Sequence, residues 1–202
     1  MKNKTTRIIF YTILALILPV LLIYFNIIPF MYRKFVLVIV VAINIIGIYT
    51  EKMSIYELGI RIDNLKRAFL PYFLFTLLSA TLIVGYASYS GKTPVEYWWK
   101  IPYLQFAFIP TSIVQEFIYR GFFQTQLQKI MKPINCILIA AIVFSFMHIL
   151  WNSAEFITMT LLGGLKWGFL WYKYPNLIWV SISHSILNFL INYFGFINIG
   201  GS

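Results

Sequence analysis

Three apolar segments of the sequence each carry polar side chains that are costly inside a membrane. Glu116 and Arg120 lie in one segment, His148 in a second, and His184 with Asn188 in a third. The chain has only two histidines, and both fall in apolar runs. Because ionisable groups at membrane depth are expensive and usually mark function, these residues are the first candidates for chemistry.

The spacing of these residues places them on shared helix faces. Three pairs are each four residues apart: Glu116 and Arg120, Phe144 and His148, and His184 and Asn188. Residues four apart are neighbours on one face of a helix, so each segment presents one polar patch. Burying the three patches against one another would make a polar pocket inside a bundle. A carboxylate, two imidazoles and amides in such a pocket can perform acid–base chemistry on a bound water.

Each feature taken alone has a structural explanation. Glu116 and Arg120 by themselves are more often a structural ion pair, and a lone intramembrane histidine is more often bonded to a carbonyl. The occurrence of three polar faces in one chain favours a site over a set of unrelated structural contacts.

The composition indicates a membrane protein. Of 202 residues, 60% are hydrophobic and 11% are charged, whereas soluble domains average about 25% charged residues. A helix crosses a bilayer with about 20 mostly apolar residues. We therefore predict an all-α membrane protein, a polytopic bundle of about seven transmembrane helices with a polar intramembrane pocket. The expected spans are residues 8–28, 35–50, 68–89, 101–123, 134–151, 156–172 and 176–195.

The net charge of +10 indicates membrane lipid as a partner and not nucleic acid, because the basic residues flank the apolar runs. The segments on the same side of the membrane as the N-terminus hold more Lys and Arg than the segments on the opposite side. This asymmetry predicts a cytoplasmic N-terminus. The single Cys136 excludes an internal disulfide. Trp98, Trp99 and Tyr103 are expected to form an aromatic belt before the fourth span.

Three motifs in the polar segments resemble those of the CPBP family (CAAX protease and bacteriocin-processing, Abi-type), which consists of intramembrane endopeptidases. Gln115 to Arg120 is similar to its Glu-Glu-x-x-x-Arg motif. Phe144 to His148 is similar to Phe-x-x-x-His, and His184 to Asn188 is similar to His-x-x-x-Asn. The resemblance implies a core at 57–195, after an N-terminal two-helix transmembrane segment at 1–56 and before a short tail at 196–202.

The resemblance also implies roles for these residues. The first glutamate of the pair and the histidine of the second motif, here His148, activate a water that attacks a peptide bond. The third motif, here His184 and Asn188, stabilises the oxyanion. Glu116 and Arg120 would hold the site together. The implied substrate is a membrane-associated peptide, prenylated or of leader type, for peptide maturation or bacteriocin immunity, and the implied location is a bacterial plasma membrane.

The sequence departs from the family pattern at position 115, which is Gln. An amide can orient a water but cannot take its proton. Three explanations stay open at this point. Gln115 replaces a natural glutamate in this chain, the protein is a naturally non-catalytic member that binds a partner, or Glu116 acts as the base after a modest helix rotation.

A metal site, a binding protein and a transporter are the other interpretations of these residues. Two histidines and a glutamate are zinc ligands, but the sequence has no His-Glu-x-x-His pair, so no metal and no cofactor are expected. The main alternative is a non-enzymatic membrane protein that binds a peptide or protein partner in the same pocket. A transporter is disfavoured because no inverted repeat is visible.

The two histidines are expected at different depths in the membrane. His148 lies late in its span and His184 early in its own, although both helices should run in the same direction. At 1.5 Å per residue the depths would differ by roughly 10 Å.

Overall fold

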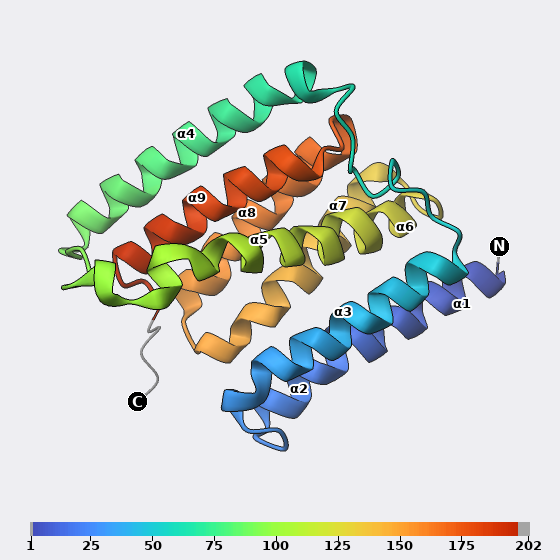
Figure 1. Ribbon diagram of the computed structural model, residues 1–202, viewed down its shortest axis with the longest axis horizontal. Coiled ribbons are helices and arrows are strands. Elements are labelled where there is room, and N and C mark those ends of the chain that lie inside the picture. Colours follow the sequence, from blue (N-terminus) through green and yellow to red (C-terminus); the bar gives the residue numbers. More distant parts are fainter. Residues whose placement is uncertain (1, 198–202) are drawn as a thin grey trace.

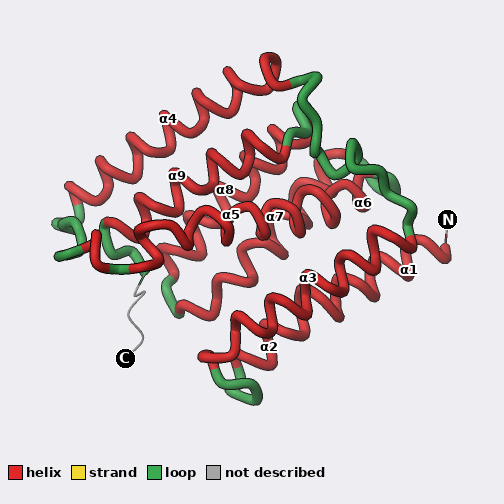
Figure 2. The backbone as a smooth tube through the Cα atoms, viewed as in Figure 1, coloured by secondary structure: helices red, strands yellow, loops and turns green. Residues whose placement is uncertain are grey.

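The structure is a computed structural model that describes residues 2–197, and helices and loops make up this part of the chain with no strand among them (Figure 2). Residues 198–202 of the expected tail lie outside the described residues. In chain order the helices are α1 (Lys2–Tyr11), η1 (Thr12–Ile17), α2 (Leu18–Tyr24), η2 (Phe30–Tyr32), α3 (Arg33–Thr50), α4 (Leu65–Tyr89), η3 (Trp98–Lys100), η4 (Tyr103–Ala107), α5 (Phe108–Glu116), η5 (Phe117–Gln124), α6 (Thr125–Gln128), α7 (Pro133–Phe146), η6 (Met147–Trp151), α8 (Ala154–Lys173) and α9 (Leu177–Tyr193).

The prediction of an all-helical membrane protein is confirmed. Four continuous helical stretches are long and apolar enough to cross a membrane. They are Lys4–Tyr24, Phe30–Thr50, Leu65–Tyr89 and Pro133–Trp151. Helices also occupy the other three segments that the sequence predicted as spans. The axes of the long helices run in roughly the same direction (Figure 1).

One long helical stretch forms the spine of the bundle. The elements η4, α5, η5 and α6 follow one another without a break from Tyr103 to Gln128. Two of them, η4 and η5, are π-helical, and Arg120 lies within η5. Insertions of this kind shift the helix face and are frequent at functional sites. All of η5 from Ile118 to Gln124 is buried, so this stretch runs through the interior.

The N-terminal helices form a separate hairpin beside this spine. The stretch α1–η1–α2 runs antiparallel to α3, and the pair lies along one side of the molecule (Figure 1). Its contact with the spine is apolar. The ring of Phe122 meets the ring of Tyr11 at 6.0 Å, and a Cβ added at Gly47 would lie 2.6 Å from the Phe122 ring. A glycine at position 47 therefore lets α3 approach the spine closely.

The loop between α3 and α4 closes one end of the bundle. Gly59 adopts φ +74°, and a Cβ there would lie 2.2 Å from Trp171 at the end of α8. The Gly59 carbonyl accepts a hydrogen bond of 2.8 Å from the Leu177 amide, at the start of α9. The nearby Glu57 carboxylate lies 2.6 Å from Lys129 Nζ, and hydrogen bonds from Lys129 and Ser54 hold the pKa of Glu57 below its ordinary value.

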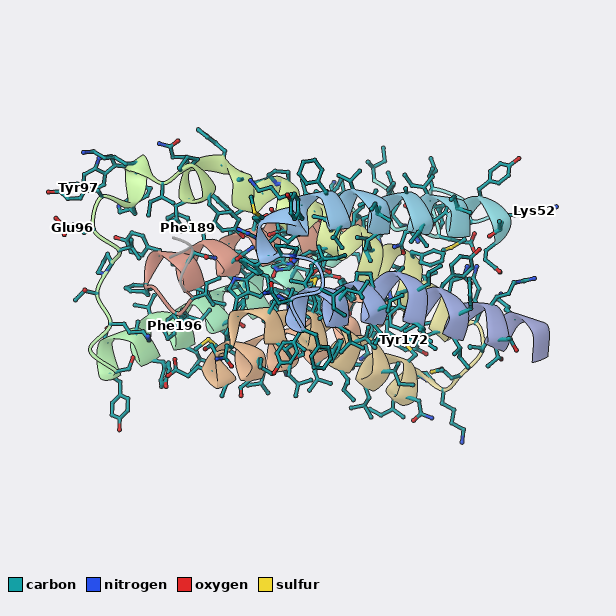
Figure 3. All side chains as sticks on the ribbon, turned by 90° about the horizontal axis from the view of Figure 1, so that it is seen from below. Lys52, Glu96, Tyr97, Tyr172, Phe189 and Phe196 are labelled. Carbon is teal, nitrogen blue, oxygen red and sulfur yellow. The ribbon has the colours of Figure 1, made fainter. Side chains whose placement is uncertain are left out.

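The two ends of the bundle are distinct. Figure 3 places Lys52 at the end closed by this loop and places Glu96 and Tyr97 at the opposite end. Helix α9 ends at that opposite end, where the Val95 amide donates to the carbonyl of Tyr193, the last residue of α9, at 2.7 Å. The polar segments identified in the sequence lie between these two ends.

Candidate functional site

Glu116 is the centre of the polar network. Its side chain is fully buried, as is that of Arg120. Arg120 Nη1 donates to Glu116 Oε1 at 3.4 Å, and Arg120 Nε lies 3.3 Å from Oε2 as an ion pair without the alignment of a hydrogen bond. His184 Nδ1 lies 2.7 Å from Oε1. The carboxylate therefore joins its own helix to α9, a link that the four-residue spacing alone could not have identified.

Two polar contacts one helical turn apart connect α5 with α9. Glu116 meets His184, and Ser112 Oγ accepts from Asn188 Nδ2 at 3.3 Å. Both residue numbers change by four, in opposite directions, which is the pattern of two antiparallel helices in register. In apolar surroundings such hydrogen bonds between helices fix both their distance and their register.

A second pair of contacts connects the spine with α8. Arg120 Nη2 donates to the Gly164 carbonyl at 3.2 Å, and Gln124 Nε2 donates to the Gly168 carbonyl at 2.7 Å. Both carbonyls belong to glycines, and a Cβ at Gly164 would lie 3.2 Å from Ala141 Cα on α7. The absence of side chains at these positions lets three helices meet around the guanidinium.

The ring of Phe144 brings the two histidines together. It lies 4.9 Å from the His148 ring and 5.7 Å from the His184 ring, measured between centroids. The Arg120 guanidinium carbon lies 4.3 Å from the centre of the same ring. The chain after Phe146 tightens into the 3₁₀ segment η6, which carries His148. The depth difference expected from the sequence does not separate the two imidazoles, because Phe144 contacts both.

The hydrogen bond of His148 determines which of its two ring nitrogens can accept a proton. Its Nδ1 lies 2.9 Å from the Phe144 carbonyl oxygen. A carbonyl can only accept, so Nδ1 carries the proton, and neutral His148 has a lone pair on Nε2. Trp151 stacks on the imidazole with centroids 5.7 Å apart, and Phe156 meets it edge-on at 5.0 Å. The ring is thus held by one hydrogen bond and two aromatic side chains.

His184 is held in a similar way. Its Nδ1 contacts the Glu116 carboxylate, and the indole of Trp167 lies 4.6 Å from its ring centroid at an angle of 30°. The Trp167 indole is itself fixed, because Nε1 donates to Ser183 Oγ at 2.9 Å. A polar and an aromatic partner therefore set the orientation of each histidine.

A cavity of about 1000 Å³ lies against this network. Four of the six sequence-predicted residues line it, namely Gln115, His148, His184 and Asn188. Glu116 and Arg120 are not among its lining residues and lie behind the wall, where they are fully buried. The structure thus separates a cavity-lining set from a supporting pair.

Gln115 is the least restrained of the cavity-lining set. Its Nε2 has one long contact, at 4.0 Å, with the sulfur of Met147. The side chain is 8% exposed, next to a neighbouring Glu116 that has no exposure at all. Because its amide makes this one weak contact, it is available to bond to a molecule bound in the cavity.

Sequence reasoning missed Tyr103 and Ser112. Tyr103 was predicted as part of an aromatic belt before the fourth span and not as a residue of the site. Its hydroxyl accepts a hydrogen bond from Asn188 Nδ2 at 3.1 Å, and its side chain lines the cavity. Ser112 precedes Glu116 by four residues on the same helix face, a spacing that could have identified it.

The acidic and imidazole groups do not form a three-ligand cluster. Within residues 2–197 no three His, Cys, Asp or Glu side chains gather in a way that could hold a metal ion. Of the two histidines, Glu116 contacts His184, while the Nδ1 of His148 bonds to a backbone carbonyl.

The fold places the chain in a broad class, the integral membrane proteins built from apolar helices. Residues 97–190 match the Rce1-like family, described as type II CAAX prenyl endopeptidase Rce1-like. The resemblance to the CPBP family, found in the three motifs, is confirmed at the level of the family over this part of the chain. Its members form a protease family. No curated protein and no solved structure matches the chain.

Proposed function

We propose that the chain is an intramembrane endopeptidase that hydrolyses a peptide bond in a membrane-associated peptide, with Gln115 limiting its rate. One observation carries the proposal. Gln115, His148, His184 and Asn188 line one cavity within the part of the chain that matches a protease family. The contacts of these residues support the roles proposed for them.

His148 is the group best placed to receive a proton. Its Nδ1–H is used by the Phe144 carbonyl, which leaves the Nε2 lone pair as acceptor. In the proposed reaction a water oxygen bonds to the scissile carbonyl carbon while its proton moves to His148 Nε2. The tetrahedral intermediate then expels the amine, which takes that proton from His148 as the C–N bond breaks. Gln115 orients the water, and the carbonyl group of the peptide lies on the side of the cavity that carries His184 and Asn188.

Gln115 makes this reaction slow. A positioned carboxylate base contributes about 10²–10⁴-fold, or roughly 3–5 kcal/mol of transition-state stabilisation, that an amide cannot supply. Glu116 is poorly suited to replace it. Its Oε1 contacts His184 and Arg120, its Oε2 faces Arg120, and neither oxygen borders the cavity.

The cavity favours an apolar substrate. Most of its lining is aliphatic or aromatic, including Leu37, Leu74, Leu82 and Phe156. A volume of about 1000 Å³ lies at the upper end of ordinary ligand pockets. We infer that a prenylated or leader-type peptide occupies it, with the peptide bond at the polar wall and the apolar part against the remaining helices.

The proposal includes the setting of the enzyme. We place all seven helical segments in the membrane, the N-terminus in the cytoplasm, and the protein in a bacterial plasma membrane. The basic residues support this arrangement, because they are concentrated near the end of the bundle closed by the loop before α4. The catalytic unit is residues 57–195, the helices of 1–56 accompany it, and the reaction uses no metal.

A second candidate function is binding without cleavage. The observation that favours it is the amide at position 115, together with a cavity that can hold a peptide. Such a protein would use the same lining residues to recognise a peptide or protein partner.

The two functions are separated by measuring binding and product formation on one sample. The full chain in lipid nanodiscs is incubated for hours with a farnesylated Cys-aliphatic-aliphatic-X peptide, and products are detected by mass spectrometry. We expect binding and slow product formation, and His148→Asn should abolish the product while keeping the affinity within about threefold. Binding without any product from either protein would favour the non-catalytic function. Failure to bind this peptide and a leader-type peptide would contradict both.

A further inference from the structure

The orientation of the Asn188 amide is set by Asn192. Asn192 Nδ2 lies 2.6 Å from the Asn188 backbone carbonyl oxygen and 2.7 Å from Asn188 Oδ1. A backbone carbonyl can only accept, so the Asn192 amide nitrogen must face Asn188. The side chain of Asn188 therefore turns its oxygen to Asn192 and its nitrogen to Tyr103 and Ser112.

Both hydrogens on that nitrogen already have acceptors. Asn188 Nδ2 lies 3.1 Å from the Tyr103 hydroxyl and 3.3 Å from Ser112 Oγ. Ser112 uses its own hydroxyl hydrogen on the Phe108 carbonyl at 2.8 Å. The Tyr103 hydroxyl accepts from Asn188, so its hydrogen is available to a further acceptor.

In their neutral forms the two histidines have no ring N–H that is free to donate to a further acceptor. His148 Nδ1–H is used by the Phe144 carbonyl, and His184 Nδ1–H is used by Glu116. Each Nε2 is then an acceptor. Hydrolysis needs hydrogen-bond donors, not acceptors, at the carbonyl oxygen, because negative charge develops on that oxygen.

Tyr103 lies far along the helix from the other site residues, but its hydroxyl extends towards the place of the scissile carbonyl oxygen. It precedes Ser112 by nine residues, about 13 Å along a helix, yet both side chains meet the same Asn188 nitrogen. The phenol must therefore extend along the helix towards the site. Ser112 lies three residues, or one turn, before Gln115, and Tyr103, Gln115 and His184 all line the cavity.

We propose that Tyr103 is a catalytic residue of this site, whose hydroxyl donates a hydrogen bond to the carbonyl oxygen of the scissile peptide bond. The assignment rests on the proposed endopeptidase function. When water attacks, the carbonyl π electrons move to oxygen, and the phenol O–H stabilises that charge without giving up its proton. The charge returns to the carbon as the C–N bond breaks. Asn188 is then a positioning residue that holds the phenol.

The test compares two ligands and so does not depend on turnover. One is a farnesylated peptide, and the other is the same peptide with a phosphinate, a stable tetrahedral anion, in place of the scissile amide. Affinities of both are measured for the full chain and for Tyr103→Phe in nanodiscs. We expect the phosphinate to lose about 10²-fold in affinity, the effect of removing one oxyanion donor, and the peptide to lose less than about threefold.

Matched variants separate this role from a structural one. Tyr97→Phe, in an exposed residue at the end of the bundle (Figure 3), should change neither affinity. If Tyr103→Phe folds poorly, 3,5-difluorotyrosine at position 103 keeps the hydroxyl and makes it a stronger donor, so phosphinate binding should tighten relative to peptide binding. Equal changes for the two ligands would overturn the assignment while leaving the proposed function intact. If the unaltered chain binds neither ligand, the proposed function fails and the assignment fails with it.

Discussion

The N-terminal hairpin and the helices around the cavity are built from similarly apolar residues but are held together differently. Between the hairpin and the spine the contacts include the close approach at Gly47 on α3 and the ring contact of Tyr11 on α1 with Phe122. Between α5, α8 and α9 the contacts include side-chain hydrogen bonds at successive helical turns. The hairpin packs on the spine through apolar contacts, whereas α5, α8 and α9 are joined by packing together with side-chain hydrogen bonds.

The difference has a physical meaning in a membrane. Lipid tails are as apolar as leucine, so packing and polar contacts hold helices together there in place of a hydrophobic driving force. Polar contacts fix register as well as distance, and a site that positions reacting groups needs both. The match to the protease family covers residues 97–190, which includes the polar helices and none of the hairpin. The expectation is that substitutions in the two regions differ strongly in cost.

The largest effect is expected for Arg120→Ala. It leaves the buried Glu116 carboxylate without its guanidinium, and breaking a buried pair costs about 3–5 kcal/mol in the free energy of unfolding. Denaturant unfolding in detergent micelles measures this value. The double variant Glu116→Gln with Arg120→Met removes both charges and should recover part of the loss. An unchanged unfolding curve for Arg120→Ala would show that the pair has no structural role.

A smaller loss is expected for Gly164→Leu. The added side chain would meet Ala141 and Phe144 within 3.3 Å at its Cβ alone, and such overpacking costs about 1–3 kcal/mol. Gly85→Leu is the matched control, because a Cβ at Gly85 on α4 meets nothing within 4 Å. Similar melting temperatures for the two variants would contradict the close approach of α7 and α8.

The smallest effect is expected for Tyr11→Phe in the hairpin. The substitution removes an exposed hydrogen bond of 3.0 Å to Thr50 and keeps the ring beside Phe122. Thr50 still bonds to the Gly47 carbonyl. The cost should be about 1 kcal/mol or less. A loss as large as that of Arg120→Ala would remove the distinction between the two regions.

The sequence was sufficient for the parts of the site that depend on spacing within one helix. Glu116 and Arg120 are paired as their separation of four residues predicts, and the apolar runs correspond to helices. The prediction that seven helices cross the membrane stays a prediction, since four stretches meet the length and hydropathy that a crossing requires.

The spacing of residues within one helix does not predict contacts between helices. The bond between Glu116 and His184 depends on how α5 packs against α9, which periodicity within one segment does not encode. The contact of Tyr103 with Asn188 was not predicted for the same reason. An aromatic residue near a helix start is typical of a membrane surface, and only the three-dimensional arrangement brings its hydroxyl to Asn188.

The central claim is that this cavity is a protease site whose base position holds an amide, and Gln115→Glu tests it most directly. Gln and Glu have nearly the same size, so the exchange keeps the shape of the cavity and adds a group that can take a proton. Cleavage of the farnesylated peptide is measured for both proteins in the same nanodiscs, with binding measured in parallel. We predict equal binding within about threefold and a rise in cleavage rate of about 10²-fold or more for Gln115→Glu. Equal cleavage rates, or no cleavage by Gln115→Glu while the peptide remains bound, would contradict the claim.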